Sequence, residues 1–344
     1  MLPLRTSTKR IAVHTLLCLP MLASRQAAYA QEQEEERQGN IVEYFGKEKV
    51  EDINEGKLVH VFQKGLVLGL GRGFGFARRE STPIDRVMAR FLFRQPTGVD
   101  ADRVFDVDSS GQPMRWEEIE VDDKSTFQDR RLRSGVLYLS YTSETDQTVL
   151  LDASGHTRLL VDGMPHDGDH YDFGWQLIPL HLTKGKHEFV LQGGRFDRMR
   201  ARLIEPDSLV RFTNRDVTLP DIRRGEAAEL WGAIRVINAT DVDLDAAAVE
   251  CRVGDLVTKS AVPRIATRTI RKAPFLFPPI EVADAEKEQV EFELELFSKS
   301  GESLAQEKIT LNVRSPGKHH KRTFLSDVDG SVQYYSLAPC TDPE

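Results

Sequence analysis

The feature that most constrains the fold is a strict alternation of apolar and acidic side chains over residues 290–296. Val, Phe and two Leu residues stand at the even positions, and glutamates stand at the odd positions. Successive side chains of a β-strand point to opposite faces, so this segment predicts a strand with one core face and one solvent face. A turn at residues 299–302 leads to a second alternating run at 309–313. Together these runs predict an antiparallel hairpin.

Short apolar runs closed by turn residues recur along the chain. They lie at residues 136–141, 148–151, 159–161, 177–182 and 189–191. Strands of this length, with turns every 8–12 residues or so, are typical of a β-sandwich or barrel. The same pattern restarts after Glu205-Pro206. We therefore predict an all-β protein with two tandem β-sandwich domains: a jelly-roll-like sandwich at 56–205 and an immunoglobulin-like or fibronectin-III-like sandwich at 206–315.

The N-terminus has the three parts of a secretory signal in order. Basic residues (Arg5, Lys9 and Arg10) precede an apolar stretch at 11–23, and Ala28-Tyr29-Ala30 supplies a small-x-small cleavage site. We predict a signal peptide at 1–30 and export to the periplasm or the extracellular space. An acidic leader follows at 31–55. Residues 316–344 are expected to be a solvated basic linker and the truncated start of a third unit.

Composition excludes some classes of function. The formal net charge is -8, and no Lys/Arg-rich run with interleaved aromatic residues is present, which argues against nucleic-acid binding. No stretch of about 18 uninterrupted apolar residues is present, so a membrane-spanning helix is not expected. Of the three cysteines, Cys18 belongs to the predicted signal, which leaves Cys251 and Cys340. They can form one bridge, but two separate thiols are the simpler expectation.

Residues 111–203 resemble the jelly-roll, galactose-binding-like or PA14-like accessory domains of large secreted bacterial hydrolases. The resemblance rests on Trp116 and on the runs 150–156, 160–163, 167–171, 178–180 and 182–185. In such proteins an immunoglobulin-like domain follows, and then a prolyl-oligopeptidase-like or esterase-like α/β-hydrolase domain, whose first strands resemble residues 324–339. That enzyme needs a G-x-S-x-G nucleophile elbow, and this sequence contains none.

The resemblance thus implies an exported, non-catalytic accessory region that holds a hydrolase at its substrate or in an assembly. Two alternatives stay open: a stand-alone carbohydrate-binding module, and a structural envelope protein. We expect no active site within these residues, and the partner would be a polysaccharide or a protein substrate.

Two clusters are candidate sites. Asp106, Asp108, Ser110 and Glu117 have the spacing of a calcium loop, in which hard oxygens and a final bidentate Glu surround the ion. The flanking residues are predicted strands rather than helices, so a plain hairpin turn is the alternative. No other cofactor is expected.

The second cluster lies in the loop 162–175 and contains polar groups for a sugar or a metal together with aromatic stacking faces. Its members are Asp162, His166, Asp169, His170, Tyr171 and Trp175. Asp residues in turns often bind their own backbone instead.

Overall fold

The structure, a computed structural model, describes residues 56–69, 83–94, 99–107, 111–169 and 172–338. Within these ranges the chain is nearly all β-strand, with one α-helix, α2 (Pro83–Leu92), and a short 3₁₀ helix, η2 (Arg130–Leu132). The all-β prediction is confirmed. The predicted signal peptide and acidic leader lie outside the described residues. In the part of the chain that the structure describes, every helix is too short or too polar to cross a membrane.

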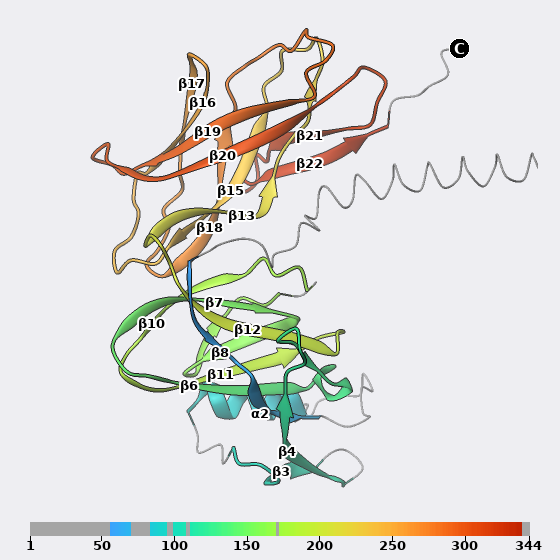
Figure 1. Cartoon of the computed structure of the whole chain (residues 1–344), viewed down its shortest axis with the longest axis vertical. Coiled ribbons are helices and arrows are strands. Elements are labelled where there is room, and N and C mark those ends of the chain that lie inside the picture. The colour runs from blue at the N-terminus through green and yellow to red at the C-terminus, as the bar shows by residue number, and fades with distance from the viewer. Residues whose placement is uncertain (1–55, 70–82, 95–98, 108–110, 170–171, 339–344) are drawn as a thin grey trace, which may run out of the picture. The chain divides into compact units, whose positions relative to one another are not determined.

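Two sheets form the first sandwich (Figure 1). One has the order β1-β12-β7-β10, with β5 also paired to β12. The other has the order β3-β4-β2-β6-β11-β8-β9. The strands of the first sheet are β1 (Lys57–Val61), β5 (Phe127–Gln128), β7 (Gln147–Ser154), β10 (Leu177–Leu182) and β12 (Arg198–Glu205). The strands of the second are β2 (Lys64–Leu68), β3 (Val104–Val107), β4 (Pro113–Glu120), β6 (Val136–Ser143), β8 (His156–Val161), β9 (Met164–His166) and β11 (Gly185–Gly193).

Both faces of the second sheet are buried, which explains the unbroken apolar run at the start of β6. Leu137 and Leu139 belong to the core between the two sheets. Val136 and Tyr138 belong to a separate cluster on the other face, which α2 covers (Figure 1). The helix contributes apolar side chains at i, i+3, i+4 and i+7, the spacing of one helix face: Ile84, Val87, Met88 and Phe91. This helix was not expected from the sequence.

The second sandwich also has two sheets. A three-stranded sheet contains β13 (Val210–Thr218), β15 (Trp231–Asn238) and β18 (Thr269–Leu276). A five-stranded sheet contains β14 (Ile222–Arg223), β16 (Ala248–Val253), β17 (Leu256–Ala261), β19 (Gln289–Phe297) and β20 (Ser303–Arg314). Strand β19 is the alternating segment: its even-numbered side chains from Val290 to Leu296 are at most 4% exposed. Its predicted antiparallel partner is β20.

Strands β21 (His320–Leu325) and β22 (Val332–Leu337) form a hairpin whose only described strand pairing is with each other. The linker expected before it is not solvated throughout, because His320 and Lys321 are buried. The backbone N–H of Lys321 donates to Asp221 Oδ2 (2.6 Å), and Thr323 Oγ1 donates to the carbonyl of Trp231 (2.6 Å). These polar contacts hold the hairpin against the second sandwich.

Candidate functional site

Asp162, the first residue of the predicted ligand loop, serves the turn between β8 and β9. It has a positive φ of 50° and is followed by Gly163 at 82°, the conformation of a tight hairpin turn. Its Oδ1 accepts from the backbone N–H of Glu188 (2.8 Å), and its Oδ2 lies 2.6 Å from His187 Nδ1. Both carboxylate oxygens are therefore engaged with β11.

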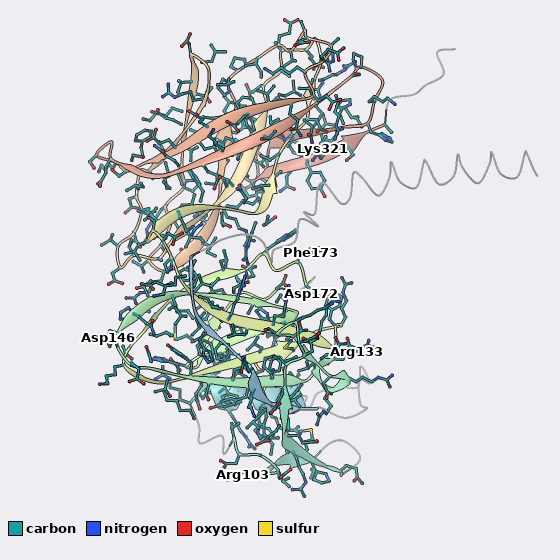
Figure 2. All side chains as sticks on the ribbon, in the orientation of Figure 1. Arg103, Arg133, Asp146, Asp172, Phe173 and Lys321 are labelled. Carbon is teal, nitrogen blue, oxygen red and sulfur yellow. The ribbon has the colours of Figure 1, made fainter. Side chains whose placement is uncertain are left out.

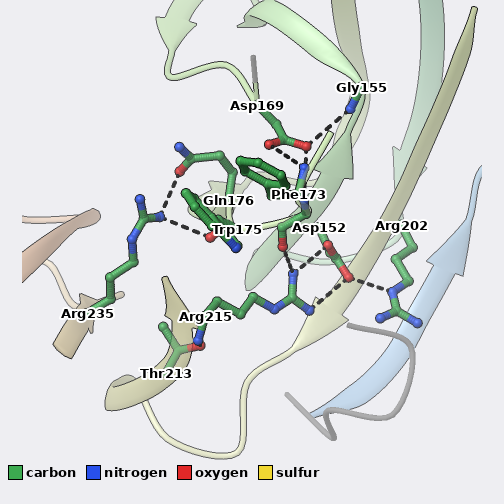
Figure 3. Close-up of polar contacts among 11 residues, drawn as sticks. Asp152, Gly155, Asp169, Phe173, Trp175, Gln176, Arg202, Thr213, Arg215 and Arg235 are labelled. Carbon is green, nitrogen blue, oxygen red and sulfur yellow. Dashed lines mark hydrogen bonds and ion pairs between the residues drawn. The ribbon is translucent and has the colours of Figure 1, made fainter. Parts of the chain in front are cut away.

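Asp169 is buried and accepts hydrogen bonds from backbone N–H groups, which is the role that the turn interpretation of this loop gives to its Asp residues. Its carboxylate accepts hydrogen bonds from the N–H groups of Gly155 (3.3 Å), Phe173 (3.1 Å) and Gly174 (3.0 Å). The ring of Trp175 packs against Phe173 with 4.4 Å between centroids (Figure 3). Figure 2 shows Phe173 next to Asp172 on the segment that leads from β9 to β10. Asp169 and Trp175 thus belong to one structured turn.

The loop does not form a single cluster. Asp162 follows the end of β8, whereas Asp169 binds Gly155 just before its start. A strand of six residues separates the two ends by roughly 20 Å. His166 lies on β9, opposite Leu159, and burial lowers the pKa of its imidazole. His170 and Tyr171 lie outside the described residues. Ligand binding by this loop remains a prediction.

The predicted calcium residues are divided between the two faces of the β3–β4 hairpin. Asp106 stands opposite Met114, and Glu117 is three positions farther along β4, so its side chain points to the other face. Asp106 Oδ2 accepts from Arg86 Nε of α2 (2.7 Å), and Glu117 pairs with Arg131 of η2 (2.5 Å). The structure does not bring Asp106 and Glu117 together. Asp108 and Ser110 lie outside the described residues, and calcium binding stays a prediction.

No group of three His, Cys, Asp or Glu side chains among the described residues has the arrangement to hold a metal ion. Cys251 is a buried free thiol whose pKa is raised to about 12 by burial. Its predicted counterpart Cys340 is not among the residues described, so their pairing is not tested.

The most strongly organised polar cluster is one that the sequence did not suggest. It joins the two sandwiches through Arg215 of β13, whose side chain is fully buried. Arg215 Nη1 donates to Asp152 Oδ1 (2.8 Å) and to the carbonyl of Gly174 (2.8 Å), and Nη2 donates to Asp152 Oδ2 (3.2 Å). Arg202 Nε donates to the same Oδ2 (2.8 Å; Figure 3).

Asp152 stays ionised in this setting. Burial by itself raises the pKa of its carboxyl, but the hydrogen bonds and positive charges of Arg215 and Arg202 outweigh that effect and hold the pKa below its usual value. A neutral carboxyl would deprive the buried guanidinium of the negative charge of Asp152, so the ionised form of the pair is favoured.

A second arginine reaches the same segment of the first sandwich. Arg235 Nη1 donates to the carbonyl of Trp175 (3.0 Å) and to Gln176 Oε1 (3.2 Å; Figure 3). Its position is fixed by Asp216, which also accepts from Lys272 Nζ (2.8 Å). An apolar cluster lies beside these polar contacts, with buried members from both sandwiches: Leu150, Leu177, Ile204, Ile237 and Ala239. We call the polar and apolar contacts together the joint.

Sequence reasoning missed the joint because its main pair is far apart in the chain. Arg215 and Asp152 are separated by 63 positions. One signal was present: a lone Asp at 152 follows an apolar run in β7. Charged residues at otherwise core-facing positions need a buried partner, but the sequence alone does not say which.

No family model matches this chain, and no curated protein matches it. Among solved structures it is similar to a Bacteroides uniformis β-glucuronidase, at 12% identity and a TM-score of 0.30 over 59% of this chain and 28% of that one. It is also similar to the Amycolatopsis orientalis exo-chitosanase CsxA (9% identity, TM-score 0.32, 81% of this chain and 36% of that one). A β-glucuronidase from glycoside hydrolase family 2 is similar as well (8% identity, TM-score 0.30, 76% and 31%).

The chain thus spans about a third of the length of these structures. At such identities and TM-scores the likeness carries no argument about fold or activity, and the all-β fold class rests on the strands of the chain itself.

Proposed function

We propose that residues 56–338 form a non-catalytic accessory region of a larger exported hydrolase and position it at its substrate or in an assembly. The observation that carries the proposal is the joint. A positioning element must transmit a defined geometry, and the buried Arg215–Asp152 pair, with the apolar cluster beside it, favours one arrangement of the two sandwiches. A flexible linker would give a broad range of distances instead.

The bonding pattern of the joint supports this role. The two arginines contact the carbonyls of Gly174 and Trp175 as well as side chains, and carbonyls are fixed points of the backbone. The guanidinium of Arg215 also meets both oxygens of Asp152, and such a bidentate contact fixes orientation as well as distance. Interfaces between domains of one chain usually permit relative motion unless they are large and apolar. The buried pair and the buried apolar cluster both act against such motion.

The identity of the enzyme rests on the sequence resemblance to accessory regions that precede an α/β-hydrolase domain, and export rests on the signal-like N-terminus. The carbohydrate-binding alternative through the loop 162–175 has less support, because Asp162 and Asp169 already bind protein groups. The structural-envelope alternative is compatible with the same joint.

The first experiment measures the intact mass of the native protein from the envelope fraction of the producing cell. We expect a mass larger than that of residues 31–344 by a catalytic domain. A mass equal to residues 31–344 would favour the stand-alone binding or structural alternatives.

The second experiment tests positioning in that longer native protein. Removing residues 56–315 should leave hydrolysis of a small soluble ester or peptide unchanged and reduce hydrolysis of a polymeric or surface-bound substrate. Equal loss on both kinds of substrate would contradict a positioning role. Purified residues 31–344 serve as the control and should hydrolyse neither.

A further inference from the structure

A small polar pocket lies on the face of the first sheet that is turned away from the core of the first sandwich. It has a volume of about 190 Å³, and its lining comes from β1, β7, β12 and the turn after β4: Val61, Lys124, Ser125, Asp152, Ser154, Arg200, Ala201 and Arg202. In the register of β7 and β12, Asp152 is opposite Arg202 and Ser154 is opposite Arg200. These four polar side chains therefore share one face, while Ala153 and Ala201 between them belong to the core.

The hydroxyl of Ser154 is unsatisfied within the part of the protein that the structure describes. Ser154 is 3% exposed, and its Oγ has no hydrogen-bond partner among the described residues. Buried polar groups are almost always hydrogen-bonded, and leaving one unpaired is unfavourable. Because Ser154 lines the pocket, a bound molecule with a hydroxyl group would supply the missing partner.

Only one of the three guanidinium nitrogens of Arg202 has a hydrogen-bond partner among the described residues. Its Nε donates to Asp152, and neither terminal nitrogen has a protein partner within the described ranges of the chain (Figure 3). The terminal nitrogens form a planar fork that matches the two oxygens of a carboxylate or phosphate. Asp152 thus leaves the anion-binding edge of Arg202 available.

The charge of the pocket is positive despite the acidic chain. Asp152 is the only acidic side chain among the described residues of the lining, and buried Arg215 neutralises it from the second sandwich. Arg202 adds one positive charge. Lys124 adds a second from a turn whose shape is set by Asp122, which accepts from the N–H groups of Lys124 (2.9 Å) and Thr126 (2.9 Å).

We propose that this pocket binds a small polyhydroxylated anion, a sugar acid or a sugar phosphate. The positive lining and the arginine fork select the anionic group, and the unpaired Ser154 hydroxyl selects a neighbouring hydroxyl. At about 30 Å³ per water molecule, the volume corresponds to about six waters, which limits the ligand to one small ring or the terminal unit of a chain. This site goes beyond the proposed positioning role, which does not depend on it.

Calorimetric titration of the purified protein tests the proposal with three probes: D-glucuronate, glucose 6-phosphate and D-glucose. We expect one of the two anions to bind, glucose to bind at least tenfold more weakly than that anion, and affinity to fall as salt is added. Tighter binding of glucuronate assigns a sugar acid, and tighter binding of glucose 6-phosphate assigns a sugar phosphate. Inorganic phosphate should bind more weakly than either, because it offers no sugar hydroxyls.

Two variants locate the binding. Arg202→Gln removes the guanidinium fork and should lower the affinity for the preferred anion by about tenfold or more, since each hydrogen bond to a charged group contributes on the order of a tenfold change in affinity. Ser154→Ala should weaken it about three- to tenfold, with no loss of thermal stability, because the hydroxyl has no protein partner to lose among the described residues.

The matched control is Lys64→Gln. It removes one positive charge at an exposed ion pair with Glu120 on the other sheet, and the affinity should stay within about twofold. Absence of binding by both anions, equal binding of glucose, or an affinity unchanged in Arg202→Gln would each overturn the proposal.

Discussion

Asp152→Asn is the substitution that tests the joint most directly. It keeps the size of the side chain and removes only its charge. Arg215, whose side chain is fully buried, then loses the negative charge of Asp152, while its hydrogen bond to the Gly174 carbonyl remains. Removing one member of a buried ion pair typically costs about 3–5 kcal/mol, because the remaining charge stays out of water.

The structure places Asp152→Asn within that range. The carboxylate accepts three hydrogen bonds from two arginines, and its side chain is 10% exposed. In chains of this size the melting temperature falls by about 2 °C for each kcal/mol lost from the free energy of unfolding. We therefore expect the melting temperature to fall by about 6–10 °C. Arg202→Gln, at a side chain that is 34% exposed, should lower it by about 2 °C or less.

The dependence on pH has a definite sign. The pKa of Asp152 is lower in the folded protein than in the unfolded chain, so its contribution to stability is present above the unfolded pKa and is lost as the pH falls through the folded value. The difference in melting temperature between wild type and Asp152→Asn should therefore be constant from pH 6 to 8 or so. Below about pH 4 it should shrink.

A double variant separates the cost of an unpaired charge from a loss of packing. Asp152→Leu with Arg215→Met replaces the whole pair by apolar groups, which is often neutral or stabilising. We expect its stability to lie well above that of either single variant. A loss below about 1 kcal/mol for Asp152→Asn, or a double variant as unstable as the singles, would refute the role of the buried ion pair in the joint.

Three further predictions concern the interior. Leu137→Ala should lower the free energy of unfolding in urea by about 2–5 kcal/mol, because Leu137 is fully buried, whereas Val328→Ala, at a side chain 96% exposed, should change it by less than about 0.5 kcal/mol. Burial raises the pKa of the Cys251 thiol to about 12, so this thiol should resist iodoacetamide in the native protein at pH 8 and react once the protein is unfolded. Peptide mass spectrometry measures the labelling, and labelling of the native protein would contradict the burial of Cys251. Burial lowers the pKa of the His187 imidazole, but its hydrogen bonds to Asp162 and to the Thr183 carbonyl outweigh burial and raise that pKa overall. The stabilisation from protonated His187 is therefore complete below about pH 6.5 and is lost as the pH rises through the pKa of the folded protein. The stability difference between wild type and His187→Gln should be larger at pH 6 than at pH 9.

The fold class followed from local patterns because each strand carries its own signal. The alternation at residues 290–296 required β19 to have one core face, and the turn after it required a hairpin. Strand β6 shows the limit of that method. Its unbroken apolar run fits a strand buried on both faces, but nothing local says that a helix supplies the second cover.

Helix α2 illustrates why that cover was missed. Its ten residues carry an apolar stripe at helical spacing, yet the stripe is only two turns long and a short apolar pattern fits a strand almost as well. An isolated helix of this length is marginal in water. It forms in this protein because Trp116, Tyr138 and their neighbours provide an apolar surface on which it packs. Such a tertiary contact cannot be predicted from the sequence of one segment alone.

The candidate sites were harder to predict than the strands because their chemistry depends on pairings across the fold. Asp162 and Asp169 look like ligands in the sequence, but both serve as hydrogen-bond acceptors for other parts of the protein. The sequence did not mark Asp152 and Ser154 as site residues. They became informative only when the register of β7 and β12 placed them beside two arginines.

Asp152 connects the joint to the pocket, and that connection has a testable consequence. One carboxylate both compensates Arg215 at the joint and fixes the orientation of Arg202 in the pocket. Asp152→Asn should therefore reduce stability and release Arg202 from its fixed orientation, whereas Arg202→Gln should reduce affinity and nearly spare stability. Arg215→Met should lower stability, yet it leaves Asp152 charged in the pocket lining, where the carboxylate repels an anionic ligand. If the joint and the pocket share this carboxylate, Arg215→Met must also weaken anion binding, although Arg215 is not part of the pocket lining.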